Sequence, residues 1–182
     1  MNHWHHHRLV VETDGSFRCH DITAELQGFI DRCGIRDGLL VAAGQHTTTA
    51  LVVNEAEERL LADIEHFFLE LAPPTRPWLH NDLHLRPGIP ADEPRNAHSH
   101  LIALLLGNHL SLPVQQGRLG LGTYQAVLLV ELDGPRRRQL QLHGRRTLER
   151  CRLARRDLPL AGERVRRRGG RAGVWRRRRQ RQ

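Results

Sequence analysis

Four clusters of polar side chains interrupt the apolar segments of this 182-residue chain. The first is His46-Thr47-Thr48-Thr49, which is followed after a short apolar run by Asn54 and Glu55. A buried strand normally avoids a histidine beside three hydroxyls, because each polar group must find a hydrogen-bond partner. The junction is therefore either a costly structural detail or the wall of a site.

The other three clusters contain side chains that can transfer a proton, bind an anion or ligate a metal ion. They are His80 with Asp82; Asn96 with His98 and His100; and Thr123 and Gln125 with Glu131 and Arg136. Glu131 stands out because it follows the apolar run 127–130. A carboxylate in that position needs a partner, such as an arginine, a metal-bound histidine or a substrate.

Histidines from three of these segments could meet at a metal ion, since neutral imidazole is a common ligand of zinc. The chain contains no HExxH or similar local motif, so only the fold could bring them together. On a helix, His98 and His100 would point about 200° apart, so that only one of them would face a given site. If the helix begins after His98, both could face it. A plain structural or surface role is the alternative for each histidine.

Asn54 and Asn96 each precede an expected helix. A helix start offers free N–H groups and the positive end of the helix dipole, which suit a phosphate or pyrophosphate. Arg136 could add a bidentate contact to the same anion. The alternative is ordinary helix capping, for which Asn is a preferred residue and which needs no ligand.

The apolar periodicity around these clusters predicts one compact α+β domain with about three helices and mixed or antiparallel sheets. The expected helices open at Asp21 or Thr23, at Asn54 with Glu57 as its capping-box partner, and at Asn96. A buried stripe is expected on the second helix, at Leu60, Leu61, Ile64, Phe67, Phe68 and Leu71. The expected strands are 9–11, 17–20, 39–44, 49–53, 112–114, 118–121, 124–132 and 139–143.

Two further segments bear on the organisation of the chain. Residues 75–95 lack periodicity, and a loop of this length in a compact domain is often functional or mobile. The adjacent histidines 5–7 look like a purification tag, but the interrupted composition around them favours a natural strand with alternate residues in solvent.

Charge divides the chain into a domain, residues 1–144, and a tail, residues 145–182. The tail contains sixteen arginines and three acids, whereas the domain contains twelve arginines and seventeen acids. Arginine runs without an apolar face are typical of a disordered extension, and a nucleic-acid-binding arm is the alternative. The chain has no lysine, which excludes lysine Schiff-base chemistry and any phosphate loop that needs a lysine.

The remaining composition indicates a cytoplasmic protein. Its three cysteines show no paired spacing, which argues against a disulfide framework. The first residues lack the apolar region of a secretory signal. No apolar run reaches the roughly 18 residues needed to span a bilayer, so no membrane association is expected.

Six motifs in one order resemble the YjbQ-like family, whose members are also described as secondary thiamine-phosphate synthases. They are DIT at 21–23, HTTTALVVNE at 46–55, LHND at 79–82, NAHSHL at 96–101, LPVQQGRLGLGTYQ at 112–125 and ELDGPRRR at 131–138. The match covers residues 9–144, and several ungapped motifs in order are more specific than any one of them. The tail lies outside the resemblance.

The resemblance implies a small α+β protein that assembles as a homotrimer and binds a divalent metal, zinc or magnesium. The implied reaction condenses hydroxymethylpyrimidine pyrophosphate with thiazole phosphate and releases pyrophosphate. The implied catalytic residues are His46, His80, His100, Glu131 and Arg136. The implied metal ligands are His46, His80, His98 and His100. The implied substrate-binding residues are Thr47, Thr48, Asn54, Glu55, Asp82, Asn96, Thr123 and Gln125.

Three functional hypotheses remain open at this point. The first is a transferase of the thiamine-phosphate synthase type. The second is a zinc-dependent hydrolase, or another enzyme that acts on an unidentified phosphorylated metabolite. The third is a nucleic-acid-binding protein that works through the arginine-rich tail.

Overall fold

The computed structural model describes residues 4–147, and within them the chain forms two antiparallel sheets and three α-helices. The larger sheet has the order β1 (Trp4–Glu12), β8 (Arg137–Arg146), β3 (Gly38–Gly44), β5 (His109–Gln115), β6 (Arg118–Leu119). The smaller sheet has the order β2 (Arg18–Asp21), β7 (Ala126–Glu131), β4 (Thr49–Asn54). The predicted α+β class is confirmed. The predicted start of the tail at residue 145 is wrong, because Arg145 and Arg146 are the last two residues of β8. The prediction for the rest of the tail, residues 148–182, lies outside the described residues.

The histidine-rich beginning of the described chain forms the strand β1. β1 pairs with β8 over its whole length, and His6 lies directly opposite His143. The two imidazoles approach to 2.8 Å between their Nδ1 atoms. The next histidine, His7, stacks on Phe29 with 5.9 Å between ring centroids. The predicted alternation of β1 between solvent and interior holds from Arg8 to Glu12, whereas His6, His7 and Arg8 are all exposed.

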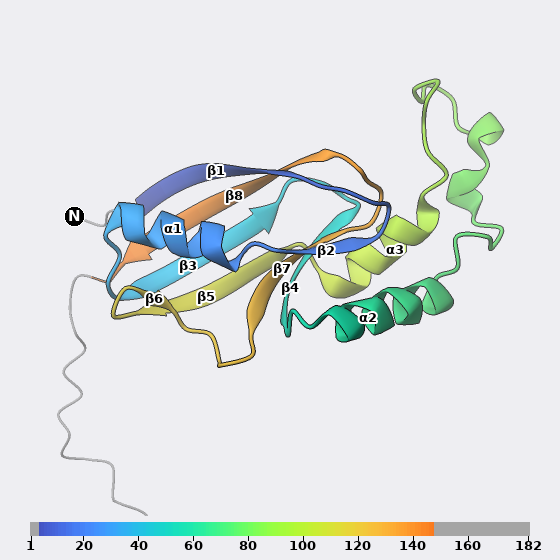
Figure 1. The fold of residues 1–182 in the computed structure, drawn as a ribbon. Coiled ribbons are helices and arrows are strands. Elements are labelled where there is room, and N and C mark those ends of the chain that lie inside the picture. The colour runs from blue at the N-terminus through green and yellow to red at the C-terminus, as the bar shows by residue number, and fades with distance from the viewer. Residues whose placement is uncertain (1–3, 148–182) are drawn as a thin grey trace, which may run out of the picture. The chain divides into compact units, whose positions relative to one another are not determined.

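The three α-helices are α1 (Thr23–Cys33), α2 (Glu58–Leu71) and α3 (Ala97–Leu106). The loop between α2 and α3 contains two short 3₁₀ turns, η1 (Leu79–Asn81) and η2 (Leu83–Leu85), and projects from the body of the domain (Figure 1). The cap predicted for α1 differs in detail. Ile22 occupies the N-cap position without a side-chain bond, while the Asp21 carboxylate accepts the Thr23 N–H over 2.9 Å.

Two predictions about α2 are wrong. The helix begins at Glu58, and the Glu57 carboxylate caps it by accepting the N–H groups of Arg59 and Leu60. Asn54 cannot cap the helix, because it is still paired with Ala126 as the last residue of β4. The expected stripe is also only partly buried, since Phe67 and Leu71 are exposed and no residue of α2 is fully buried.

The smaller sheet lies between two layers of apolar side chains. Val127 and Leu129 of β7 join a core with α1 and the larger sheet, whereas Val130 joins a second core with Ile102 and Ala103 of α3. Because both faces of β7 are covered, all six of its residues are buried. This double burial explains why β7 has a continuous apolar sequence in place of an alternating one.

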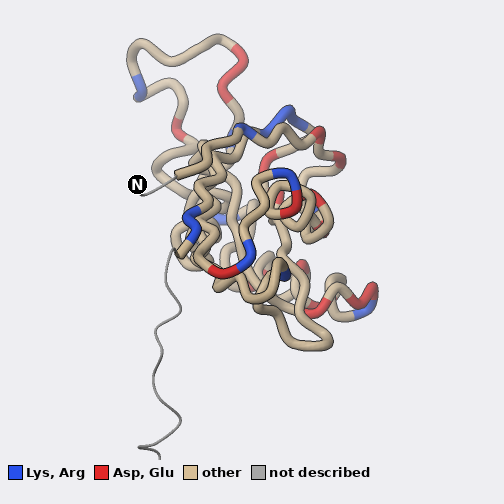
Figure 2. The backbone as a smooth tube through the Cα atoms, turned by 90° about the vertical axis from the view of Figure 1, so that its left-hand side faces the viewer, with Lys and Arg blue, Asp and Glu red and all other residues tan. Residues whose placement is uncertain are grey.

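The outer surface carries charges of both signs. Figure 2 shows basic and acidic positions interspersed along the described backbone. None of the helices in residues 4–147 combines the length and the apolar character that are needed to cross a lipid bilayer.

Candidate functional site

The turn between β3 and β4 holds the imidazole of His46. The backbone N–H of Thr48 donates to Nδ1 of His46 over 3.2 Å, and the Thr48 hydroxyl lies 2.9 Å from the same nitrogen. Asn and Asp side chains shape turns in a similar way, by accepting the N–H two residues later. The contacts between His46 and Thr48 therefore fix the conformation of this turn, which lies at one end of the smaller sheet.

A buried ion pair lies behind this turn. Glu131, at the end of β7, has no exposed surface and pairs with Arg138 of β8, which is 2% exposed. The Thr13 hydroxyl donates to the same carboxylate over 2.8 Å, and Nη2 of Arg138 donates to the Thr48 hydroxyl over 3.3 Å. A continuous chain of polar contacts thus joins Glu131 to His46.

The partners of Glu131 keep its carboxylate ionised. Burial alone would raise its pKa. Hydrogen bonds from Arg138, from the backbone of Asp133 and from Thr13, together with the positive charge of Arg138, outweigh this effect, and the net pKa is below the ordinary value of 4.5. Glu131 therefore finds the arginine partner that its position requires, and it has no exposed surface with which to touch a substrate.

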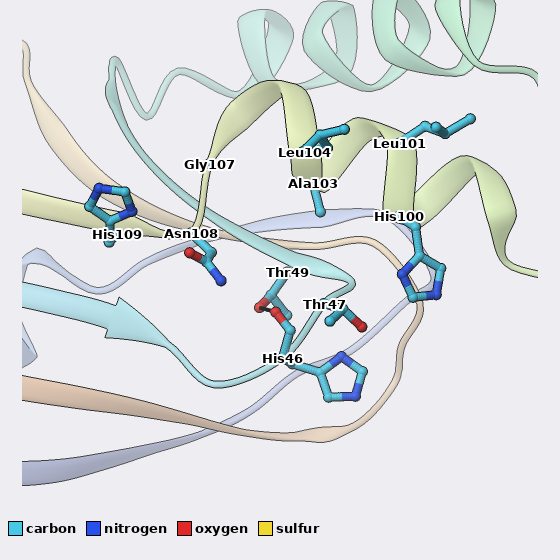
Figure 3. Close-up of a pocket in the computed structure, with 10 residues that line it drawn as sticks. All are labelled: His46, Thr47, Thr49, His100, Leu101, Ala103, Leu104, Gly107, Asn108 and His109. Carbon is cyan, nitrogen blue, oxygen red and sulfur yellow. Dashed lines mark hydrogen bonds between the residues drawn. The ribbon is translucent and has the colours of Figure 1, made fainter.

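A pocket of about 440 Å³ lies between the β3–β4 turn and α3. Figure 3 shows that His46 and Thr47 contribute to it from the turn and His100 from the helix. The remaining lining residues are Thr49, Leu101, Ala103, Leu104, Gly107, Asn108 and His109. The fold thus brings two of the predicted catalytic histidines to one pocket.

His80 joins these two histidines from the α2–α3 loop. Its ring meets that of His100 edge to face, with 4.9 Å between centroids. Arg86 holds the loop around it by donating to the His80 carbonyl over 3.1 Å and to the Glu93 carboxylate over 2.9 Å. The position of His80 therefore depends on a local ion pair as well as on the contact with α3.

The start of α3 is fixed by groups from two other segments. The Asn81 side-chain oxygen accepts the N–H of Ala97 over 3.1 Å and so caps the helix. Asn96 occupies the N-cap position but makes no side-chain cap. Its amide instead donates to the Asp133 carboxylate over 2.8 Å, and Arg136 also donates to Asp133. Asn96 therefore stands at the helix start as predicted, but the alternative of ordinary side-chain capping is wrong for it.

The pKa of His46 lies below the ordinary value of 6.5. Partial burial of its ring is the largest cause, and the positive charges of Arg138 and Arg136 lower the pKa further. The carboxylates of Glu131 and Asp133 oppose this effect. His46 is therefore a neutral imidazole at pH 7, able both to donate and to accept a hydrogen bond.

The pKa values of His100 and His98 are also lowered, in both cases mainly by burial. The neighbouring His80 contributes to the shift of His100. His98 turns away from that pair: its Nε2 lies 3.3 Å from the Ser99 hydroxyl, which donates to the Leu132 carbonyl. Nδ1 of His98 is buried without a hydrogen-bond partner among residues 4–147.

The structure separates several predicted substrate-binding residues from this pocket. Asn54 pairs with Ala126 at one end of the β4–β7 ladder, whereas Thr49 pairs with Glu131 at the other end. Glu55, Thr123 and Gln125 adjoin the Asn54 end and are exposed. Five strand steps of about 3.3 Å therefore lie between these residues and the His46 turn.

Asp82 and Arg95 line a different pocket of about 430 Å³, in the α2–α3 loop. Trp78 and His84 contribute to the same pocket. Asp82 therefore lies near His80 along the chain but faces another space.

The same geometry shows which side chains of one chain could hold the zinc or magnesium ion that the sequence predicts. Within the part of the chain that the structure describes, no three His, Cys, Asp or Glu side chains are grouped so that they could hold a metal ion. His80 and His100 offer at most a pair of nitrogens, and His98 is directed elsewhere. Side chains taken from residues 4–147 of one chain therefore do not fit a metal centre with three protein ligands.

Four residues of the network have no predicted role: Thr13 lies outside the polar clusters and motifs, and Asn81, Asp133 and Arg138 lie within the LHND and ELDGPRRR motifs. Arg138 had a usable signal, since it shares a strand face with the apolar Leu140 and Leu142 at intervals of two residues. An arginine in such a register needs a buried partner. Asn81 and Thr13 had no local signal, because each contacts a residue that is distant in the sequence.

Comparison with known proteins gives one consistent result. A family model described as "UPF0047 protein YjbQ-like" matches residues 7–145. A UPF0047 protein of Methanothermobacter thermautotrophicus is 38% identical over 74% of this chain and 87% of its own length. One from Archaeoglobus fulgidus is 39% identical over 72% of this chain and 94% of its own length.

Solved structures agree with the sequence comparisons. A YbjQ-like protein from Sulfolobus solfataricus has a TM-score of 0.72 and 34% identity, and the match covers 81% of this chain and all of that chain. A hypothetical protein from Aeropyrum pernix has a TM-score of 0.68 and 39% identity, with 76% of this chain and 96% of that chain covered.

Proposed function

The chain belongs to the YjbQ-like UPF0047 family, and we propose that it is an enzyme that acts on a small phosphorylated metabolite. The observation that carries the proposal is the convergence of His46 and His100 on one pocket, with His80 against His100. These side chains come from three separate elements. A neutral imidazole such as that of His46, at a pocket beside arginine residues, is suited to proton transfer and to binding of anionic oxygens.

The specific reaction that we propose is condensation of hydroxymethylpyrimidine pyrophosphate with thiazole phosphate. The thiazole nitrogen forms a bond to the methylene carbon of the pyrimidine, while the bond from that carbon to the pyrophosphate oxygen breaks. The bonding electrons leave with pyrophosphate, and the nitrogen nucleophile requires no base. The task of the protein is then to orient the two substrates and to stabilise the departing negative charge.

Arg136 and His46 are the residues that we assign to the departing pyrophosphate. Arg136 is exposed and donates to Asp133, so an incoming anion would compete for the same guanidinium. Its positive charge already acts on His46. His100 and His80 would orient the heterocyclic substrates from the other side of the pocket.

The test is product formation by the full chain. The protein is incubated with both precursors and a magnesium salt, and thiamine phosphate is measured by chromatography. We expect product, with at least a tenfold lower rate for the His100→Ala variant, in line with the usual effect of removing a positioned histidine. His66→Ala, on the exposed surface of α2, is the matched control. No product from the intact protein would refute this reaction.

A zinc-dependent hydrolase is the second candidate, because the His80–His100 pair could offer two nitrogens to a metal. Metal analysis of the purified full chain tests it. Stoichiometric zinc that is lost in both His80→Ala and His100→Ala would favour this candidate. Protein without zinc that still forms thiamine phosphate would exclude it.

Self-assembly into a homotrimer is part of the proposal. The separation of Thr123 and Gln125 from the histidines supports it, since a second copy could supply these residues to the pocket.

Nucleic-acid binding through the tail is the remaining alternative. It predicts that deletion of residues 148–182 abolishes binding and that affinity falls steeply with salt. Binding that survives the deletion would remove it.

A further inference from the structure

The hydrogen bonds of the β3–β4 turn determine which nitrogen of His46 carries the proton. The backbone N–H of Thr48 can only donate, so Nδ1 of His46 must offer it a lone pair. The Thr48 hydroxyl accepts from Nη2 of Arg138, which also can only donate. The hydroxyl proton is then free to point at Nδ1, 2.9 Å away. A neutral imidazole has a single ring proton, which is therefore on Nε2.

The protonated nitrogen is available to a ligand. Nε2 of His46 makes no hydrogen bond to any of residues 4–147, and the residue is exposed. The ring lines the same pocket as His100, and Figure 3 shows its free edge directed away from Thr47 and Thr49. The turn thus presents a donor whose direction is set by the protein before any ligand arrives.

We propose that His46 uses its Nε2–H as a fixed hydrogen-bond donor to an oxyanion of the substrate, and that Thr48 and Arg138 are the positioning residues for this donor. The proposal rests on the proposed function, because the oxyanion would belong to the phosphorylated metabolite. Arg138 holds the Thr48 hydroxyl, and the buried Glu131 in turn holds Arg138. Within this network, His46 is therefore the residue that contacts the ligand, and the others act through its imidazole.

This assignment separates His46 from the metal-ligand candidates. A histidine binds a metal through a nitrogen that carries a lone pair, and the second nitrogen usually donates a proton to a carboxylate, carbonyl or water. His46 has the opposite arrangement, with its lone pair turned toward Thr48 and its proton at the free nitrogen. In this conformation it is suited to an anion and not to a cation.

Nuclear magnetic resonance of the full chain, with ¹⁵N-labelled histidine rings, tests the tautomer directly. The His46 signals are identified by their loss in the His46→Asn variant. We expect Nε2 to be protonated and Nδ1 to be unprotonated near pH 7. Thr48→Val should give a measurable population of the Nδ1–H form, and Thr48→Ser should restore the original ratio. A protonated Nδ1 in the wild-type protein would overturn the assignment.

Two substitutions of His46 test its Nε2–H donor and its Nδ1 acceptor separately. His46→Asn keeps an acceptor at the position of Nδ1 but has no group where Nε2–H stands. His46→Gln can place an amide N–H near the position of Nε2 but leaves Thr48 without its acceptor. With inorganic pyrophosphate as the probe, we expect His46→Asn to bind about tenfold more weakly and His46→Gln to retain part of the affinity.

The outcomes distinguish this proposal from the enzymatic one, because the tautomer and pyrophosphate binding are measured without turnover. Wild-type affinity in a correctly folded His46→Asn protein would refute the donor role. A shift of His46 Nε2 on titration with Zn²⁺, with loss of its proton, would also refute it and restore the metal-ligand role. Failure to form thiamine phosphate, with the expected tautomer and binding, would refute only the proposed reaction.

Discussion

At the scale of single residues, the buried Glu131–Arg138 ion pair supports the wall of the pocket behind His46. Its two charges are taken almost completely out of water, and Thr13 and Thr48 satisfy part of the remaining hydrogen-bonding capacity. Such a pair contributes little net stability compared with apolar residues of the same size, but loss of one partner is costly. The pair is therefore best explained by its position behind His46.

Glu131→Gln should strongly destabilise the protein. The substitution keeps the size of the side chain but leaves the charge of Arg138 buried without its partner, and we expect a loss of about 3–5 kcal/mol in the free energy of unfolding. Urea denaturation measures this loss. Arg137→Gln is the control, because Arg137 is exposed and its ion pair within residues 4–147 is the exposed one with Glu12, over 3.3 Å. Its effect should stay within about 0.5 kcal/mol. A loss below about 1 kcal/mol for Glu131→Gln would contradict the argument.

Acidification should lower the stability in two stages. The pKa values of His46, His98 and His100 are lower in the folded protein than the ordinary 6.5, so below about pH 6.5 the unfolded chain takes up more protons and the folded state loses stability. The pKa of Glu131 is below 4.5 in the folded protein, so its contribution is present above that pH and is lost as the pH falls further. Urea unfolding at several pH values measures both stages.

The histidines can be tested individually in the same series. His100→Asn should reduce the slope of stability against pH between about 7 and 5, because one lowered pKa is removed. His66→Asn, on the surface of α2, serves as the reference substitution. Equal slopes for the wild type and His100→Asn would show that His100 does not contribute.

Among the elements, α3 links the site to the projecting loop. His80 and Asn81 are adjacent in the loop, and each contacts α3: one through the ring of His100 and the other through the N–H of Ala97. The helix start and the histidine contact are therefore coupled through a single 3₁₀ turn. Arg86 stabilises this turn from the loop side.

Asn81→Ala should destabilise α3 by about 1 kcal/mol, the usual cost of losing a side-chain cap. Asn81→Asp keeps an acceptor and places a negative charge at the helix start, so it should cost less than the alanine substitution. Urea denaturation measures the stability, and the ring signals of His80 and His100 report the local change. An alanine variant as stable as the wild type would show that Asn81 is not the cap of α3.

The existence of each helix could be predicted from the sequence, because apolar periodicity depends only on nearby residues. The start of α2 could not. Asn54 and Glu57 both have capping chemistry, and the choice between them depends on the pairing of Asn54 with Ala126, a residue far along the chain. His46 could be recognised as unusual from its neighbours in the sequence. Its contacts with Thr48 and Arg138 could not be predicted, because Arg138 is also far along the chain.

For the whole molecule, the exposed apolar side chains are concentrated on α2, α3 and the loop between them. Leu104 is 81% exposed, Leu105 64%, Phe67 60% and Leu71 52%. The sequence predicted that Phe67 and Leu71 would be buried, since they continue an apolar stripe. In a single chain nothing in residues 4–147 buries them. Several exposed apolar side chains on neighbouring elements are typical of a contact between proteins.

We therefore expect the exposed α2–α3 surface to be the contact between copies in the proposed homotrimer. Leu104→Glu should dissociate the assembly, because it would bury a charge without a partner at each contact. Light scattering coupled to size-exclusion chromatography measures the mass of the full chain and of the variant. Val10→Glu, on the outer side of β1, is the control and should leave the assembly intact. Dissociation by Val10→Glu but not by Leu104→Glu would place the contact on the larger sheet, and a monomeric wild type would refute the trimer.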